Sequence, residues 1–364
     1  DLSQINHSQF QIFGREKEVS ILINDINNNN ILDQNEYIEF YAKKNDGWLD
    51  ELVYDSVQNI TDKYFSLFND TINYYFTWNN GFNNLRTIIE SDVEFDQYST
   101  IDYCWKKILE KYSSTYVMGE KSSGISSPKY TAGEGWSGPQ RNIGGPYVTN
   151  LNSNNFFSGG PNAYGLINLA STNSSTVNID GNNHNTKFYI NSNLIYDSSY
   201  FGYKVLNIDF NIQNSNLSNT TTIEHYIGNI SQSFDNQHVS SIELCYPHNT
   251  NFSEYDALHF GLSLDQKKRF TINNMINNSS NPTLYMLDNI NRIIPISENA
   301  NSWEAVIPPS SSDTNLFYLF DQNSIHEVTN FKSVSQNGYF TEYNSLQIDS
   351  AFIIITNKNL LPSA

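Results

Sequence analysis

The sequence has little positive charge and no long hydrophobic run. Its 20 Lys and Arg residues face 38 Asp and Glu residues, which gives a formal net charge of -18 at pH 7. An acidic surface of this kind repels phosphate backbones and anionic lipids. No run of 18 apolar residues occurs, so no membrane-spanning helix is expected. We therefore predict no nucleic-acid partner and no direct membrane insertion.

Cysteine is also scarce. The two cysteines, Cys104 and Cys245, are too few and too far apart for a disulfide framework, and we expect isolated buried thiols. Cys245 lies three residues before His248, but proximity in sequence is not a catalytic arrangement, since the fold normally brings nucleophile and base together. No catalytic residue is predicted in this chain.

Aromatic residues are abundant, with 24 Tyr and 22 Phe among 364 residues, and they indicate a folded chain long enough for more than one domain. Residues 10–110 contain short β-prone stretches separated by Gly, Asn and Asp, namely "FQIFG", "EVSILI", "YIEFYA", "ELVYD", "YFSLF" and "NYYFTWN". The segment 101–112 fits both helical spacing and strand alternation, so the pattern leaves its structure open.

A Gly-, Ser- and Pro-rich segment from Lys121 to Gly145 is the predicted domain boundary. Beyond it, "VLNIDFNI" and "ALHFGLSL" alternate as half-buried strands do, and "DGNNHN" and "DNQH" are typical of turns. The predicted fold class is all-β, with two antiparallel, jelly-roll-like β-sandwich domains at 1–145 and 146–347. The apolar run in "DSAFIIITNKNLLPSA" predicts that 348–364 begins a third, α/β domain.

The stretch "DINNNNILDQNE" has the ligand spacing of a twelve-residue calcium loop between two predicted strands. Its Asn30 stands where such loops usually have Gly, although Asn tolerates the left-handed conformation needed there. The alternative is an Asn/Asp turn capped by its own side chains. The predicted ligands of a structural Ca²⁺ ion are the side chains of Asp25, Asn27, Asn29, Asp33 and Glu36 and the carbonyl of Ile31.

Tryptophan and tyrosine side chains also suggest a sugar-binding module, because aromatic faces stack on sugar rings. Trp136, in the Gly-rich stretch "GEGWSGP", is the tryptophan we expect to be exposed and the candidate ligand-binding residue.

Several motifs occur in the same order as in a known family, namely "FQIFGREKEVSILI", "NEYIEFYAKKNDGWLDELVYD", "YFSLFNDTINYYFTWN" and "GEGWSGP". Over about residues 10–140 the chain resembles the region before the catalytic domain of gingipain-like C25 cysteine peptidases. Relatives of these peptidases include the sortase-like proteins of the type IX secretion system in Bacteroidetes. The segment "AFIIITNKNLLPSA" resembles the first strand of the caspase-like domain that follows in this family.

The resemblance implies a non-catalytic scaffold or pro-region that positions or supports a peptidase or transpeptidase domain at the outer cell surface. The family's His and Cys pair lies beyond the strand at Phe352, so no catalytic residue is carried over to this chain. The implied partners are the C-terminal peptidase domain of the parent chain and secretion-system or outer-membrane proteins. A glycan-binding β-sandwich of a secreted protein is the alternative function.

Overall fold

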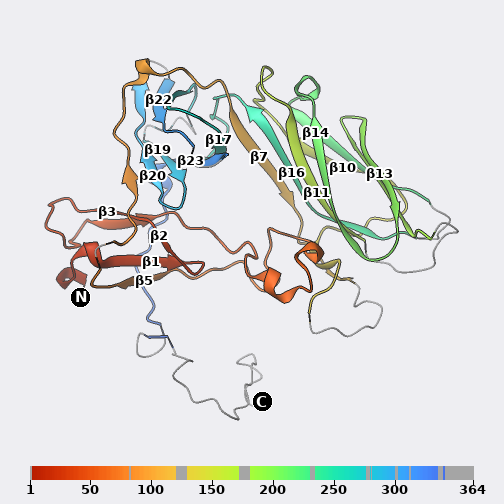
Figure 1. The fold of residues 1–364 in the computed structure, drawn as a ribbon, viewed down its shortest axis with the longest axis horizontal. Helices are drawn as coiled ribbons and strands as arrows, with labels where there is room; N and C mark the ends of the chain where they lie inside the picture. The colour runs from red at the N-terminus through yellow and green to blue at the C-terminus, as the bar shows by residue number, and fades with distance from the viewer. Residues whose placement is uncertain are drawn as a thin grey trace, which may run out of the picture. The chain divides into compact units, whose positions relative to one another are not determined.

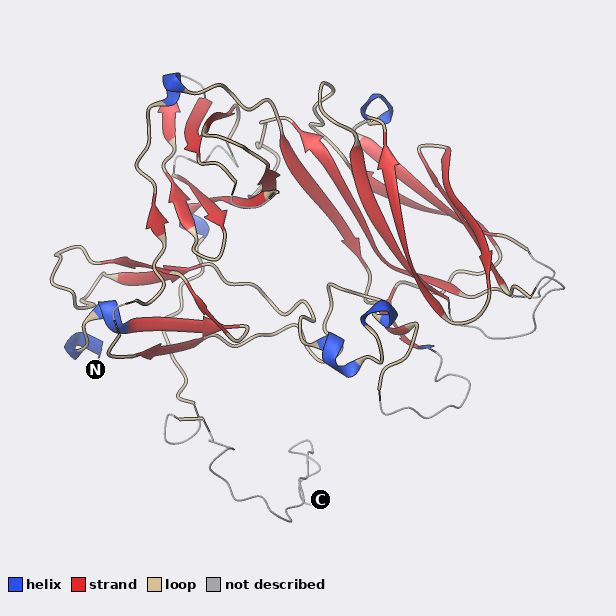
Figure 2. Ribbon diagram, in the orientation of Figure 1, coloured by secondary structure: helices blue, strands red, loops and turns tan. Residues whose placement is uncertain are grey.

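A computed structural model shows β-strands joined by loops and short 3-10 helices (Figure 2), so the all-β prediction is confirmed. The described residues are 2–81, 83–119, 129–171, 181–229, 234–275, 279, 281–299, 302–310, 313–334 and 339–340. Within these ranges no helix has the length and apolarity needed to cross a bilayer. The helices are η1 (Leu2–Gln4), η2 (His7–Gln9), η3 (Asp50–Val53), η4 (Val57–Asn59), η5 (Phe95–Gln97), η7 (Asn214–Asn216) and η9 (Gln322–Ser324).

The chain forms two compact units, Asp1–Asn323 and Ser324–Ala364. The first unit begins with a small module built around a core of Phe10, Ile12 and Ile21. In this module β1 (Phe10–Gly14) pairs with β2 (Lys17–Val19) and β5 (Tyr75–Trp78), while β3 (Ile21–Asn24) pairs with β4 (Tyr37–Phe40). Burial alternates along β1, as the sequence pattern predicts.

Two of the predicted strands in this region are wrong. The stretch "ELVYD" lies mainly in η3 (Asp50–Val53), and "YFSLF" forms no strand. The carboxylate of Asp50 accepts hydrogen bonds from the Leu67 N–H, at 2.6 Å, and from the Ser66 hydroxyl, at 3.2 Å. These tertiary bonds hold Asp50 at the start of η3, and β propensity alone does not predict them.

The first sandwich packs a four-stranded sheet against one part of a nine-stranded sheet. The four-stranded sheet consists of β10 (Gly144–Asn152), β15 (Thr220–Ile227), β12 (His184–Ile190) and β13 (Asn193–Tyr200), in that order. The facing strands are β14 (Lys204–Ile212), β11 (Ala163–Ser171), β16 (Gln237–His248) and β7 (Cys104–Lys111). Residues of both sheets fill the core, among them Ile167, Leu169, Phe188, Ile223 and Leu244.

The nine-stranded sheet continues into a second sandwich. Its further strands are β17 (Ala257–Leu262), β23 (Asn315–Asp321), β19 (Pro282–Leu287), β20 (Arg292–Ile294) and β6 (Ile88–Ile89). A second core joins them to the sheet of β18 (Lys268–Ile272), β22 (Ser302–Ile307) and β21 (Ser297–Asn299), through residues such as Phe260, Phe270, Leu284, Ala305 and Phe317. The alternation predicted for "VLNIDFNI" and "ALHFGLSL" is confirmed in β14 and β17.

The segment 101–112, whose structure the sequence pattern leaves undecided, contains the strand β7 (Cys104–Lys111), which belongs to both sandwiches. It pairs with β16 on one side and with β17 on the other, and Figure 1 shows it running beside β16. Its Cys104 lies in the second core, and its Ile108 packs against the first core. The hairpin of β8 (Thr115–Met118) and β9 (Glu134–Ser137) follows it in the chain. The domain boundary predicted between residues 145 and 146 remains a prediction.

The second unit begins at Ser324. Its described residues form no strand, and they include exposed apolar side chains at Val328, Phe331, Tyr339 and Phe340. The strand predicted within 348–364 lies outside the described residues.

Candidate functional site

The predicted calcium loop closes the hairpin of β3 and β4, whose register ends at the pair Asn24 and Tyr37. One oxygen of Asp33 accepts hydrogen bonds from the side-chain amides of Asn27, at 2.9 Å, and Asn29, at 2.7 Å. The carboxylate of Glu36 accepts from the backbone N–H of Ile26 and of Asp33, each at 2.8 Å. The loop therefore folds around its own acidic and amide side chains.

The backbone of this loop depends on asparagine. Asn28, Asn30 and Asn35 have φ angles of 57°, 64° and 70°, in the left-handed region that Asn tolerates better than most residues. The N–H of Asn30 donates to Asp25 at 2.9 Å. Asn30 thus adopts, at the sixth loop position, the conformation for which calcium loops usually use Gly.

Asp25 is held from outside the loop by His7. The Nε2 atom of His7 lies 2.9 Å from an oxygen of Asp25, and the His7 N–H donates to the carbonyl of Asn30 at 2.9 Å. The hydrogen bond to His7, followed by bonds from backbone N–H groups of the loop, lowers the pKa of Asp25. The carboxylate is therefore ionised at neutral pH.

The side-chain oxygens of this loop are suitable calcium ligands, and they come from both carboxylates and amides. Among the described residues there is no group of three or more His, Cys, Asp and Glu side chains placed to hold a metal. Amide oxygens are calcium ligands as well. In Asn27 and Asn29 the amide nitrogen faces Asp33, and rotating each side-chain amide by about 180° would exchange that nitrogen for the oxygen. The self-capped turn satisfies the same side chains without a cation.

Trp136 lies on β9 and is half-buried, with its ring at the edge of the Tyr116 ring at a centroid distance of 5.3 Å. Tyr116 in turn donates its hydroxyl to Glu134 at 3.2 Å. The expectation that Trp136 is the exposed tryptophan is therefore wrong, and Trp78 on β5 is the more open indole, with 52% of its surface exposed. Ligand binding by Trp136 remains a prediction.

Both cysteines have free thiols, Cys104 buried and Cys245 half-buried. Cys104 lies opposite His248 across the β7–β16 ladder, a pairing that the sequence did not reveal. Burial raises the pKa of the Cys104 thiol, and burial lowers the pKa of His248 to about 4. His248 Nε2 lies 3.0 Å from the Tyr255 hydroxyl. The Cys104 thiol and the His248 ring are therefore both neutral at pH 7, whereas a catalytic pair has a thiolate and an imidazolium.

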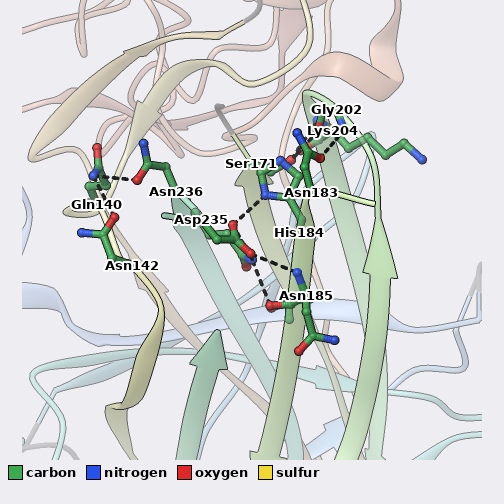
Figure 3. Close-up of polar contacts among 12 residues, drawn as sticks. Gln140, Asn142, Ser171, Asn183, His184, Asn185, Gly202, Lys204, Asp235 and Asn236 are labelled. Carbon is green, nitrogen blue, oxygen red and sulfur yellow. Dashed lines mark hydrogen bonds and ion pairs between the residues drawn. The ribbon is translucent and has the colours of Figure 1, made fainter. Parts of the chain in front are cut away.

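Sequence analysis also missed a buried polar network, drawn in Figure 3. His184 Nδ1 lies 2.6 Å from Asp235, and both side chains are fully buried. The other oxygen of Asp235 accepts from the Asn185 N–H at 2.9 Å. Gln237 donates its side-chain amide to Asp235 at 3.1 Å. The stretches "DGNNHN" and "DNQH" resembled turns, and nothing in either marked these side chains as buried partners.

His225 extends this network through Gln237, whose amide oxygen lies 3.2 Å from His225 Nε2. Arg141 donates to His225 Nδ1 at 3.1 Å, so the proton of the neutral ring is on Nε2. Burial, and then the charge of Arg141, lower the pKa of His225 to about 3. Because the network is closed to solvent and its members bond to one another, it holds β12, β15 and β16 together and is not accessible to a substrate.

Neither a protein-family model nor a curated protein matches the sequence. Among solved structures, the chain is similar to dimeric latent PorU from Porphyromonas gingivalis, with a TM-score of 0.52 and 12% identity. The similarity covers 87% of this chain and 29% of the PorU chain. At this identity it shows a shared fold. The chain thus spans well under half the length of that relative.

Two other structures are much less similar. Carbohydrate-binding module CBM36 in complex with calcium and xylotriose has a TM-score of 0.21 at 14% identity, covering 38% of this chain and 98% of the module. The VP2 subviral particle of infectious bursal disease virus has a TM-score of 0.19 at 9% identity, covering 85% of this chain and 63% of the viral one. Scores this low carry no argument about fold or ligand.

Proposed function

We propose that the chain is a non-catalytic β-sandwich scaffold of a secreted or cell-surface protein of the gingipain-like C25 or type IX sortase kind. The observation that carries this proposal is the fold shared with PorU over 87% of the chain, which agrees with the order of the sequence motifs. In this role the scaffold positions or supports a C-terminal peptidase or transpeptidase domain at the bacterial cell surface.

The structure of the first unit suits a rigid support. Strand β7 joins the cores of two sandwiches, and β4 is tied to the second sandwich where Glu39 accepts the Tyr285 hydroxyl at 2.5 Å. Neither cysteine has the raised thiolate population of a nucleophile, because burial raises the pKa of both thiols.

The test uses this chain and the proposed downstream peptidase or transpeptidase domain, produced separately. We expect the chain alone to show no thiol-dependent cleavage or transfer of Arg-, Lys- or sorting-signal peptides. We also expect it to form a complex with the downstream region in gel filtration. Turnover that Cys104→Ala or Cys245→Ala abolishes, or failure to form the complex, would contradict the scaffold role.

We further propose that the β3–β4 loop binds a structural calcium ion through Asp25, Asn27, Asn29, Asp33 and Glu36, with the carbonyl of Ile31. The support is the meeting of Asn27 and Asn29 at one oxygen of Asp33, together with the left-handed conformation of Asn30. A divalent cation would balance the charge of the Asp25, Asp33 and Glu36 carboxylates, which the turn otherwise satisfies with N–H donors. Its expected effect on stability is given in the Discussion.

Glycan binding is the second candidate function. The sequence motivated it through Trp136, which is half-buried on β9. An aromatic pocket elsewhere on the first sandwich gives it separate support and is described next.

A further inference from the structure

The outer face of the four-stranded sheet carries alternating aromatic and charged side chains on two neighbouring strands. Along β12, Lys187 and Tyr189 are half-exposed while Phe188 between them is fully buried. Along β15, Glu224 and Tyr226 alternate in the same way with buried His225. The strand register pairs Lys187 with Tyr226 and Tyr189 with Glu224. Each tyrosine therefore lies directly opposite a charged side chain.

These four side chains line an open cavity of about 660 Å³, together with Ser192, Ile227 and three glycines, Gly144, Gly145 and Gly228. This volume lies within the range of roughly 300 to 1,000 Å³ typical of small-molecule sites. Gly145 has a φ of 125°, and a Cβ there would lie 2.7 Å from the His225 carbonyl oxygen and 3.2 Å from the Tyr226 ring. Glycine at this position lets β10 approach Tyr226 closely.

The chemistry of the cavity excludes several classes of ligand. The net charge of -18 disfavours polyanions such as nucleic acids and acidic polysaccharides. Strands β12 and β15 are both paired on each side, so their backbones have no free edge to bind a peptide as an added strand. The Lys187–Asp197 ion pair, at 2.8 Å, and the Glu224 carboxylate make the face too polar for an acyl chain.

Neutral sugars fit what remains. The rings of Tyr189 and Tyr226 lie 5.5 Å apart at 74°, so they meet edge to face and present surfaces in two directions. Aromatic faces pack against the C–H groups of sugar rings, and their hydroxyls hydrogen-bond. Glu224 accepts hydrogen bonds from sugar hydroxyls, while Lys187 and Asp197 offer a donor and an acceptor beside the same cavity. We propose that this face of the first sandwich binds a neutral oligosaccharide.

Isothermal titration calorimetry with the whole chain tests the proposal, using cellohexaose, xylohexaose, mannohexaose and laminarihexaose, with oligogalacturonate as the acidic comparison. We expect at least one neutral hexasaccharide to bind with a sub-millimolar Kd and oligogalacturonate to bind more weakly. Tyr189→Ala and Tyr226→Ala should each weaken binding at least tenfold, and Glu224→Gln should weaken it several-fold.

The matched control is Tyr164→Ala, which removes a 48% exposed tyrosine from β11 in the opposite sheet of the same sandwich. It should bind as the unmodified chain does, and circular dichroism and thermal melting should show that all variants are folded. Trp136→Ala tests the alternative site suggested by the sequence, and this variant should bind sugar as the unmodified chain does. The proposal is wrong if no neutral hexasaccharide binds, if binding survives both tyrosine substitutions, or if only Trp136→Ala abolishes it. None of these outcomes bears on the scaffold role.

Discussion

Asp62 is a buried carboxyl group that is incompletely satisfied. One of its oxygens accepts the Tyr64 N–H at 2.7 Å, while the other is buried without a hydrogen-bond partner. Burial raises the pKa of Asp62 to about 7. Because the pKa in the folded state lies above the unfolded value, folding favours the protonated form, and stability is lost as the pH rises toward and through 7.

We therefore predict that Asp62→Asn stabilises the protein more at pH 8 than at pH 5, because the unfolded carboxyl is already ionised at pH 5 whereas the folded one ionises only near pH 7. Asn keeps an acceptor for the Tyr64 N–H and carries no charge to bury. The difference in unfolding free energy between variant and wild type should grow by about 2 to 3 kcal/mol between these pH values, at about 1.4 kcal/mol per pKa unit. Urea unfolding of both proteins at pH 5 and pH 8, with EDTA present, measures this difference in unfolding free energy.

The control is Asp55→Asn, which changes an exposed carboxylate in the same segment and should follow wild type at both pH values. A constant difference between Asp62→Asn and wild type from pH 5 to pH 8 would show that Asp62 is not protonated on folding.

At the scale of single elements, the β3–β4 loop is predicted to respond to calcium. Extracellular calcium modules bind at roughly 10⁻⁴ to 10⁻³ M, so tenfold excess calcium should add about 1.4 kcal/mol of stability. The melting temperature should be a few degrees lower in chelator than in calcium. Asp25→Ala and Glu36→Ala should remove this response and leave a folded protein, since both residues lie outside the core cluster of the module.

Glu298→Ala, which removes an exposed carboxylate from β21, serves as the control and should keep the calcium response. If calorimetry detects no calcium binding, or if Glu36→Ala melts with the same calcium dependence as wild type, the loop is a self-capped turn.

Strands could be predicted from the sequence where the alternation of apolar and polar residues matches the burial of one face of the strand. The strands β1 and β14 alternate because one face of each is more buried than the other, and β17 alternates up to Phe260. The strand predicted for "ELVYD" is wrong: these residues lie mainly in η3, where Asp50 is hydrogen-bonded to Leu67, 17 residues further along the chain. The segment 101–112 stayed open because β7 alternates imperfectly, as expected of a strand that contributes to two cores.

At the scale of the whole molecule, β7 makes the two sandwiches depend on each other. We predict that trypsin cuts within the Gly-, Ser- and Pro-rich segment 121–145 and that the two fragments stay together. The N-terminal fragment would carry β7, whose backbone bonds to β16 and β17 and whose Ile108 packs on the first core. The nicked protein should elute as one species in native gel filtration and separate only in denaturant.

Ile108→Asp provides the comparison, since it places a charge against the first core and should release the fragments after cleavage. Separation of the unmodified fragments under native conditions would mean that β7 contributes little to holding the sandwiches together.

The sequence by itself determined the all-β class, the hairpin around "DINNNNILDQNE" and the acidic surface, because local alternation, loop spacing and charge are properties of neighbouring residues. Only the tertiary structure decided which distant residues meet. It placed Cys104 opposite His248, buried His184 against Asp235, and set Tyr189 beside Tyr226. These contacts depend on strand order and register across a nine-stranded and a four-stranded sheet, and no local pattern encodes that order.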